Sequence, residues 1–412
     1  MGDERATMPG ARVALVVAVC LVALNMRPTI TAIGPLLEQI GTDTGMGAAT
    51  LGLVAAVPLA AWALVSPFAH DLSRRFGMTR TVTGALLLLT AGTVVRSLPG
   101  PVIGLWLGTA LIGVALAVAN VLMPAVVKRE FPARVPAMMA TYSALLGGAG
   151  AIASGLAVPT SHLAMDLGAS EGWRTALLVT GGALLLPAII VWIAATRGLP
   201  QARDTSEGAG RVSRGVWSDA TAWVVAAYMG FQSALFYILS TWLATIAVST
   251  GRTAVVAGLD VMIYQAGSVA GALLLPLAFR GAAKRWVAAA LPLIGMIGAI
   301  GLMVAPDAII VWILFLGPVS GASLGTSLIL MAERARDHHA SSALSGMSQS
   351  VGYLMAAAGP VLFGTLYATT GGWIAPLVLL TGVLVGQVVV GLAAGRERYV
   401  LDTVMPRDTH ST

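Results

Sequence analysis

Long apolar runs, separated by short charged or Gly/Pro-rich stretches, recur along the whole chain. Each run holds about 20 residues, the length that an α-helix needs to cross the hydrocarbon core of a bilayer. The regular apolar–polar alternation of membrane β-strands does not occur. We therefore predict an all-α integral membrane protein with twelve transmembrane helices. Their predicted ranges are 12–34, 48–69, 81–98, 102–127, 136–158, 173–195, 219–247, 253–279, 286–304, 308–331, 341–367 and 373–394.

The positively charged residues favour one side of these predicted helices. If the chain starts on that side, 20 of the 24 Lys and Arg residues lie in the segments there. The other four are Arg27, inside the first apolar run, and Arg96, Arg174 and Arg252, at the far ends of other runs. Lys and Arg collect in cytoplasmic loops. We therefore predict a multi-pass protein of a plasma membrane, of the bacterial inner-membrane type, with both termini cytoplasmic.

The longest hydrophilic connection, 196–217, divides the chain into six apolar runs and six. Residues 113–123 and 321–331 match at four of eleven positions, and Gly-Trp pairs at 172–173 and 372–373 open runs six and twelve. Such internal similarity indicates two parallel six-helix halves, between which transporters hold their substrates. We predict pseudo-symmetric halves at 1–195 and 218–395, a cytoplasmic linker at 196–217 and a cytoplasmic tail at 396–412.

The composition agrees with a membrane protein: 57% of the residues are hydrophobic, 10% are charged and the mean hydropathy is +0.86. A soluble domain has about 25% charged residues. The net charge of +6 follows from topology and does not indicate nucleic-acid binding. The single cysteine, Cys20, excludes an internal disulfide. We expect a monomer in the lipid bilayer with no cofactor and no metal site.

Arg27 and Pro28 interrupt the first apolar run. Placing an Arg at bilayer depth costs at least about 2.5–3.5 kcal/mol, so intramembrane charges usually serve function. Pro28 lacks a backbone N–H and should kink or unwind the helix beside this charge. We interpret Arg27 as an anion anchor near the membrane midplane and Pro28 as a residue of conformational change. Alternatively, Arg27 pairs with a carboxylate on another helix or extends to the far interface.

Other polar residues inside the apolar runs are candidate substrate ligands, because buried amides and hydroxyls need partners. Residues 232–240 form a stripe of Gln, Ser and Tyr that suits a hydrated cavity wall. Alternatively, each of these polar side chains serves only in packing between helices. Asp260 is the one carboxylate that we place inside the hydrocarbon region, as a coupling site, as the partner of Arg27, or as an interfacial residue. The candidate ligands besides Arg27 are Asn25, Asn120, Tyr142, Gln232, Ser233, Tyr237, Gln265, Gln349 and Tyr353.

The chain resembles the major facilitator superfamily and, within it, the family of cyanate and 2-nitroimidazole transporters. The resemblance rests on residues 24–31 (Leu-Asn-Met-Arg-Pro-Thr-Ile-Thr), on 120–132, on 230–233 with Tyr237 and Trp242, and on 343–353 with Gly359 and Pro360. It implies alternating access. The small residues of the eleventh run, including Gly359, allow close helix approach or sliding, and we assign Gly359 and Pro360 to conformational change.

The loop 71–80 resembles the acidic and basic loop motif of the superfamily. This likeness gives Asp71 and Arg75 a gating role. Arg74 stands where the motif has Asp, and Asp71 would substitute for it. Asp260 stands where the family pattern has an apolar residue.

We first predict a secondary active or facilitative transporter of a small anionic or polar organic solute, cyanate-like or a small carboxylate, with a proton as a candidate co-substrate. The second hypothesis is a multidrug or nitroimidazole-type exporter of neutral or cationic heteroaromatic compounds. An enzyme is the third class, and we reject it because all five His residues fall in predicted loops or tails and no nucleophile constellation occurs in the runs. Direction and coupling stay open at this point.

Overall fold

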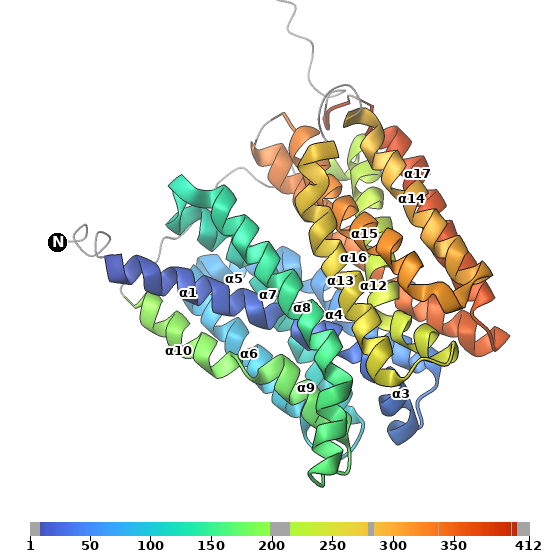
Figure 1. Cartoon of the computed structure of the whole chain (residues 1–412). Helices are drawn as coiled ribbons and strands as arrows, with labels where there is room; N and C mark the ends of the chain where they lie inside the picture. The colour runs from blue at the N-terminus through green and yellow to red at the C-terminus, as the bar shows by residue number, and fades with distance from the viewer. Residues whose placement is uncertain (1–8, 198–214, 279–283, 337, 397, 402–412) are drawn as a thin grey trace, which may run out of the picture.

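The computed structural model describes residues 9–197, 215–278, 284–336, 338–396 and 398–401 (Figure 1). Within these ranges the regular elements are helices, and twelve are long and apolar enough to cross a membrane, as predicted. The α-helices are α1 (Pro9–Met26), α2 (Pro28–Thr31), α3 (Ile33–Thr44), α4 (Ala48–Val65), α5 (Ala69–Phe76), α6 (Met78–Ser97), α7 (Ile103–Glu130), α8 (Val135–Asp166), α9 (Gly172–Gly182), α10 (Leu185–Thr196), α12 (Ala220–Ser249), α13 (Ala254–Ala278), α14 (Lys284–Val304), α15 (Ile309–Glu333), α16 (His338–Thr370) and α17 (Ile374–Ala394). Short 3₁₀ helices are η2 (Ser66–Phe68), η3 (Pro132–Arg134) and η5 (Pro306–Ala308).

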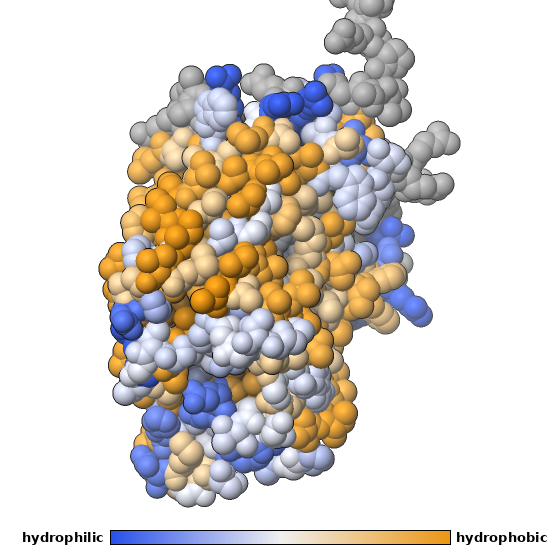
Figure 2. All heavy atoms as spheres, turned by 90° about the vertical axis from the view of Figure 1, so that its right-hand side faces the viewer, coloured by the Kyte–Doolittle hydropathy of each residue, from blue (hydrophilic) through white to orange (hydrophobic). Residues whose placement is uncertain are grey.

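An apolar belt covers the outside of the molecule. Figure 2 shows it over one face as a hydrophobic band between hydrophilic ends. Large apolar side chains are exposed in this way on the outer helices, for example Leu273 on α13 and Val378 on α17. Exposed apolar area of this extent marks a membrane or protein contact. The belt and the helix lengths together make this a multi-pass membrane protein.

Two groups of helices form the two halves: α1–α10 in the N-terminal half and α12–α17 in the C-terminal half. Between them α4 packs along α16, α8 along α13, and α3 crosses α12. The backbones of the two halves approach each other most closely at glycines of the N-terminal half. A Cβ on Gly52 would lie 2.5 Å from the carbonyl oxygen of Pro360, and one on Gly34 would overlap the carbonyl of Ser240. Backbones can meet this closely only where a residue has no side chain.

The halves touch on the side of α3 and spread apart toward the ends where α1 begins and α17 ends (Figure 1). The close contacts at Gly34 and Gly52 lie in the parts of α3 and α4 that are distant from the termini. The halves are therefore packed most closely on the α3 side.

Two membrane-crossing segments are interrupted. The first breaks at Arg27, where α1 ends and Pro28 begins α2, and again at Ala32 before α3. The predicted interruption beside Pro28 is therefore present. The sixth breaks at residues 183–184, between α9 and α10. Asn25 joins the two breaks, since its amide donates to the carbonyl oxygens of Leu21 at 2.7 Å and Leu184 at 3.1 Å.

Most of the predicted linker and most of the predicted tail lie outside the described residues. Of 196–217, residues 198–214 are outside, and of 396–412, residues 397 and 402–412 are outside. These two boundaries stay predictions. The end of the described chain is held against the C-terminal half, where the amide of Leu401 donates to the carboxylate of Asp219, which also caps α12.

Candidate functional site

Arg27 lies at the first interruption and is half-buried. Its guanidinium donates to the hydroxyl of Tyr237 at 3.5 Å and lies 5.0 Å from the ring centre of Phe236. Both of these residues belong to α12, so the Arg27 side chain bridges the two halves. Its backbone oxygen accepts from the amides of Ile30 and Thr31, which closes the turn around Pro28.

No carboxylate of the described residues lies within ion-pair distance of Arg27. Ion pairs found there join Arg74 with Asp71, Arg129 with Glu130, Arg174 with Glu171 and Arg252 with Asp260. Within the described part of the chain, Arg27 therefore has no carboxylate partner, in contrast to the first alternative. A guanidinium keeps its charge at any physiological pH. It is thus an uncompensated cation between the halves.

Aromatic side chains from both halves surround this cation. Trp62 of α4 meets the ring of Tyr353 edge-on at 4.9 Å and that of Tyr237 at 6.1 Å between ring centres. Phe236 and Tyr237 also meet edge-on, at 5.1 Å. Tyr142 of α8 donates to the sulfur of Met26 at 2.9 Å, next to Arg27 in the chain. The structure thus brings three predicted tyrosines together around the predicted anchor.

A hydrogen-bond network lies beside Arg27 and crosses between the halves. Gln265 of α13 donates to the hydroxyl of Ser154 on α8 at 2.6 Å. That hydroxyl contacts the carbonyl oxygens of Thr31 at 3.0 Å and Gly150 at 3.1 Å. Thr31 in turn donates to Gly150 at 2.9 Å. Gln265 therefore lies in a network next to the anchor, and its amide links the two halves through Ser154.

The other predicted polar ligands have more local surroundings. Gln232 and Ser233 are buried and hydrogen-bonded to each other at 2.7 Å, and both contact the sulfur of Met229. Gln349 is half-buried and donates to Ser345 one turn away, at 3.1 Å.

Asn120 is half-buried on α7. Asn25 is buried and donates to backbone oxygens of α1 and of the break in segment six. This engagement of the Asn25 amide indicates a role in holding the interruption.

Asp260 lies in α13, one of the helices long and apolar enough to cross a membrane, and is only 1% exposed. Its carboxylate pairs with Arg252, whose nitrogens lie 2.7 and 3.0 Å from the two carboxylate oxygens. Asp260 is therefore not the partner of Arg27 in this structure, and its roles as a coupling site or as an interfacial residue stay predictions. Arg252 lies in the loop before α13, so the pair is internal to the C-terminal half.

The residues that we predicted to act in gating lie in two separate places. Asp71 and Arg75 lie on the short helix α5, where Asp71 is exposed and 3.9 Å from Arg74, and Arg75 stands over the ring of Phe76. Pro360 lies inside α16 at the contact between the halves, where its carbonyl oxygen accepts from the indole of Trp242 at 3.0 Å. Gly359 packs against Ile238 of α12.

Sequence reasoning missed two residues. Trp62 is one apolar position among many in the sequence, and only its contacts with Tyr237 and Tyr353 distinguish it. Arg96 was interpreted as lying at the far end of its helix, like Arg174. It is fully buried, and its guanidinium donates to the carbonyl oxygen of Thr29 in α2 at 2.6 Å. The available signal was an arginine near the end of an apolar and threonine-rich run.

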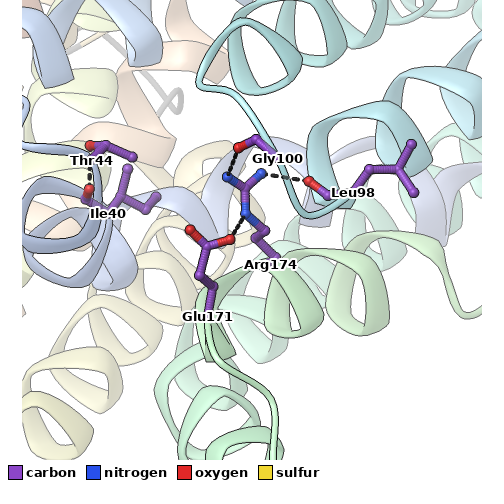
Figure 3. Close-up of polar contacts among 6 residues, drawn as sticks. All are labelled: Ile40, Thr44, Leu98, Gly100, Glu171 and Arg174. Atoms are coloured by element: carbon purple, nitrogen blue, oxygen red, sulfur yellow. Dashed lines mark hydrogen bonds and ion pairs between the residues drawn. The ribbon is translucent and has the colours of Figure 1, made fainter.

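Arg174 contrasts with Arg96 (Figure 3). Its guanidinium contacts the carboxylate of Glu171 and donates to the carbonyl oxygens of Leu98 at 2.7 Å and Gly100 at 3.0 Å. It also stands over the ring of Trp173, 4.4 Å from the centre. Arg174 therefore fastens the start of α9 to the loop between α6 and α7, and its charge is compensated.

Comparisons with known proteins agree with this architecture. The family model described as Major Facilitator Superfamily matches residues 15–360. The 2-nitroimidazole transporter of Escherichia coli (strain K12) is 37% identical over 390 residues, which cover 94% of this chain and 97% of that protein. The cyanate transport protein CynX of the same strain is 28% identical over 394 residues, covering 93% and 98%.

Among solved structures, the chain is similar to a bacterial homologue of the human lysosomal transporter Spinster in an inward-facing and unoccupied conformation. The TM-score is 0.73 at 17% sequence identity, over 94% of this chain and 96% of that one. At this identity the likeness concerns the fold alone.

Proposed function

This chain belongs to the major facilitator superfamily, and we propose that it moves a small anionic or polar organic solute by alternating access between its two halves. Membership makes it a multi-pass membrane transporter of small solutes and not an enzyme. In this proposal Arg27 is the central anchor for the negative charge or the polar group of the solute.

The observation that carries the proposal is the uncompensated charge of Arg27 where the halves meet. A guanidinium presents a planar fork that binds a carboxylate with two parallel hydrogen bonds. Charge attraction is stronger in a low-dielectric site than in water. Because Arg27 comes from one half and its contacts Phe236 and Tyr237 from the other, a bound anion would touch both halves.

The aromatic side chains support a flat solute. Trp62, Tyr237 and Tyr353 offer ring faces and edges, and aromatic rings stack favourably on planar π-systems. The relatives are named for cyanate, a small anion, and for 2-nitroimidazole, a flat ring whose N–H is made acidic by the nitro group. A planar solute with delocalised negative charge fits both the guanidinium and the rings.

The same aromatic rings also favour the alternative, an exporter of heteroaromatic compounds, but only for neutral solutes. A cationic solute would need an acid near Arg27, and the buried carboxylate of Asp260 is already paired with Arg252. Anion binding that depends on Arg27 separates the two versions, since a neutral solute would bind with little change in affinity when that charge is removed.

For the transport cycle we propose that the halves 1–195 and 218–395 rock about the central site. The present arrangement would admit solute from the side of the termini, which we place in the cytoplasm from the distribution of Lys and Arg. Opening the other side would separate the contacts of α4 with α16 and of α3 with α12. Both directions of transport are compatible with such a cycle.

The test is ligand-dependent thermal stability of the purified protein in detergent. Cyanate, benzoate and 2-nitroimidazole are added separately, the last at several pH values so that its ionised fraction changes. A ligand at 100 times its Kd contributes about 2.7 kcal/mol to the stability of the folded state. We expect stabilisation by at least one of the anions, and for 2-nitroimidazole a larger effect at the pH values where it is ionised.

Variants of the anchor complete the experiment. Arg27→Gln should abolish the stabilisation, and Arg27→Lys should retain part of it, because an ammonium keeps the charge without the planar fork. Arg12→Gln, an exposed position on the same helix α1, is the matched control and should behave as the wild type. Full stabilisation of Arg27→Gln by these anions would refute the proposal.

A further inference from the structure

Arg96 is a buried cation that the transport proposal does not use. It lies near the end of α6, fully buried, and one of its terminal nitrogens donates to the carbonyl oxygen of Thr29 at 2.6 Å. The Nε and the other terminal nitrogen are buried and have no hydrogen-bond partner in the described structure. None of the ion pairs found among the described residues includes Arg96.

Such a residue carries a large free-energy cost. Removing a charge from water is expensive, and only good geometry with a counter-charge and further hydrogen bonds offsets the expense. Arg96 has one hydrogen bond and no counter-charge. A group that costs folding free energy at membrane depth is generally retained because it serves function.

The contact of Arg96 points to the anchor. Thr29 lies two residues after Arg27, in the single turn of α2 between the two interruptions of the first segment. Both Thr29 and Arg96 lie against Gly181 of α9, just before the break in segment six. The guanidinium of Arg96 therefore lies where both interrupted segments meet and donates to a carbonyl of the short turn that follows the anchor.

We propose that Arg96 is a positioning residue for anion binding. It fixes the α2 turn through Thr29, so that Arg27 points between the halves, and it adds a second uncompensated positive charge behind the anchor. The first effect orders the guanidinium of Arg27 before the solute arrives. The second increases the attraction for an anion from a place that the solute does not touch. The inference rests on the proposed function, because it assigns the solute a negative charge.

Arg174 provides a matched comparison within the same half. It is also buried, 4% exposed, but its guanidinium has a carboxylate and two carbonyl partners. Replacing Arg174 by Met would remove a compensated charge and leave Glu171 without its partner. Replacing Arg96 by Met would remove a charge that nothing compensates. The melting temperature should therefore fall when the structural Arg174 is replaced, and stay the same or rise when Arg96 is replaced.

The experiment measures melting temperature and benzoate affinity for the purified wild type, Arg96→Met, Arg96→Lys and Arg174→Met. We expect Arg96→Met to melt at or above the wild-type temperature and to bind benzoate at least about tenfold more weakly. Arg96→Lys should recover part of the affinity, because the charge returns without the fork. Arg174→Met should melt below the wild type and keep the affinity of its folded fraction.

Two results overturn the inference. If Arg96→Met melts lower, as Arg174→Met does, and binds benzoate with unchanged affinity, Arg96 is a packing residue. If Arg96→Met melts higher and binds with unchanged affinity, its charge does not act on the site. Failure of the proposed function is a separate result: the wild type itself would then bind none of cyanate, benzoate and ionised 2-nitroimidazole, whereas failure of this inference requires that the wild type binds.

Discussion

Replacing Ser154 by Ala should shift the protein toward the arrangement that is open on the α3 side. The hydroxyl of Ser154 accepts from the Gln265 amide at 2.6 Å and contacts the carbonyl oxygen of Thr31 at 3.0 Å. Ser154 and Gln265 belong to different halves, and both are buried. The bond between them therefore exists only while α8 and α13 stay packed together.

The magnitude follows from what the substitution leaves behind. Without the hydroxyl, the buried amide of Gln265 loses its acceptor, and a stranded buried donor costs about 1–3 kcal/mol. Once α8 and α13 separate, water can hydrate that amide, so the penalty falls on the present arrangement alone. A difference of about 1–3 kcal/mol changes the ratio of the two arrangements by about 5- to 150-fold.

The shift can be measured as a distance between two spin labels on the α3 side. The background is Cys20→Ala, since Cys20 is the single cysteine of the chain. Asp43→Cys on α3 and Thr369→Cys on α16 place one label in each half, at exposed positions near the α3 side. Pulsed electron spin resonance should then show a larger fraction of long distances in Ser154→Ala.

Two further variants test the reasoning. Thr381→Ala removes a hydroxyl that bonds only to the backbone of its own helix α17, so its distance distribution should match the background. Adding Gln265→Leu to Ser154→Ala removes the stranded amide and should reverse part of the shift, because deleting both partners costs less than deleting one. An unchanged distribution in Ser154→Ala would refute the assignment of this bond as a contact that favours closure.

Two other predictions concern the C-terminal half. Asp260→Asn should lower the free energy of unfolding by about 1–3 kcal/mol, because Arg252 loses its charged partner but is itself partly exposed. The anion affinity and its pH dependence should stay as in the wild type. An altered pH dependence would instead make Asp260 a coupling site. Gly321→Val should lower the melting temperature strongly, since a Cβ there would overlap the carbonyl of Ser268 on α13. Gly382→Ala, at an exposed helical position with open space around it, is the control and should be neutral or stabilising, and equal melting temperatures for the two glycine variants would contradict the packing argument.

Several features of this protein could be predicted from sequence alone. The apolar runs predicted all twelve membrane-crossing helices, because the bilayer thickness sets a length that each segment must reach by itself. The Arg27–Pro28 pair predicted the interruption of the first segment, because a proline acts on its own helix. Both signals are local, so no knowledge of the packing was needed.

Partner choice depended on the tertiary structure. Asp260 pairs with Arg252 and not with Arg27, and the Gln265 amide binds Ser154, more than a hundred positions away. Arg96 and Arg174 look alike in sequence, as arginines at the ends of apolar runs, yet one is compensated and the other is not. The physical reason is that a side chain's hydrogen-bond and charge partners come from helices distant in sequence, so burial and charge compensation are decided only when those helices pack.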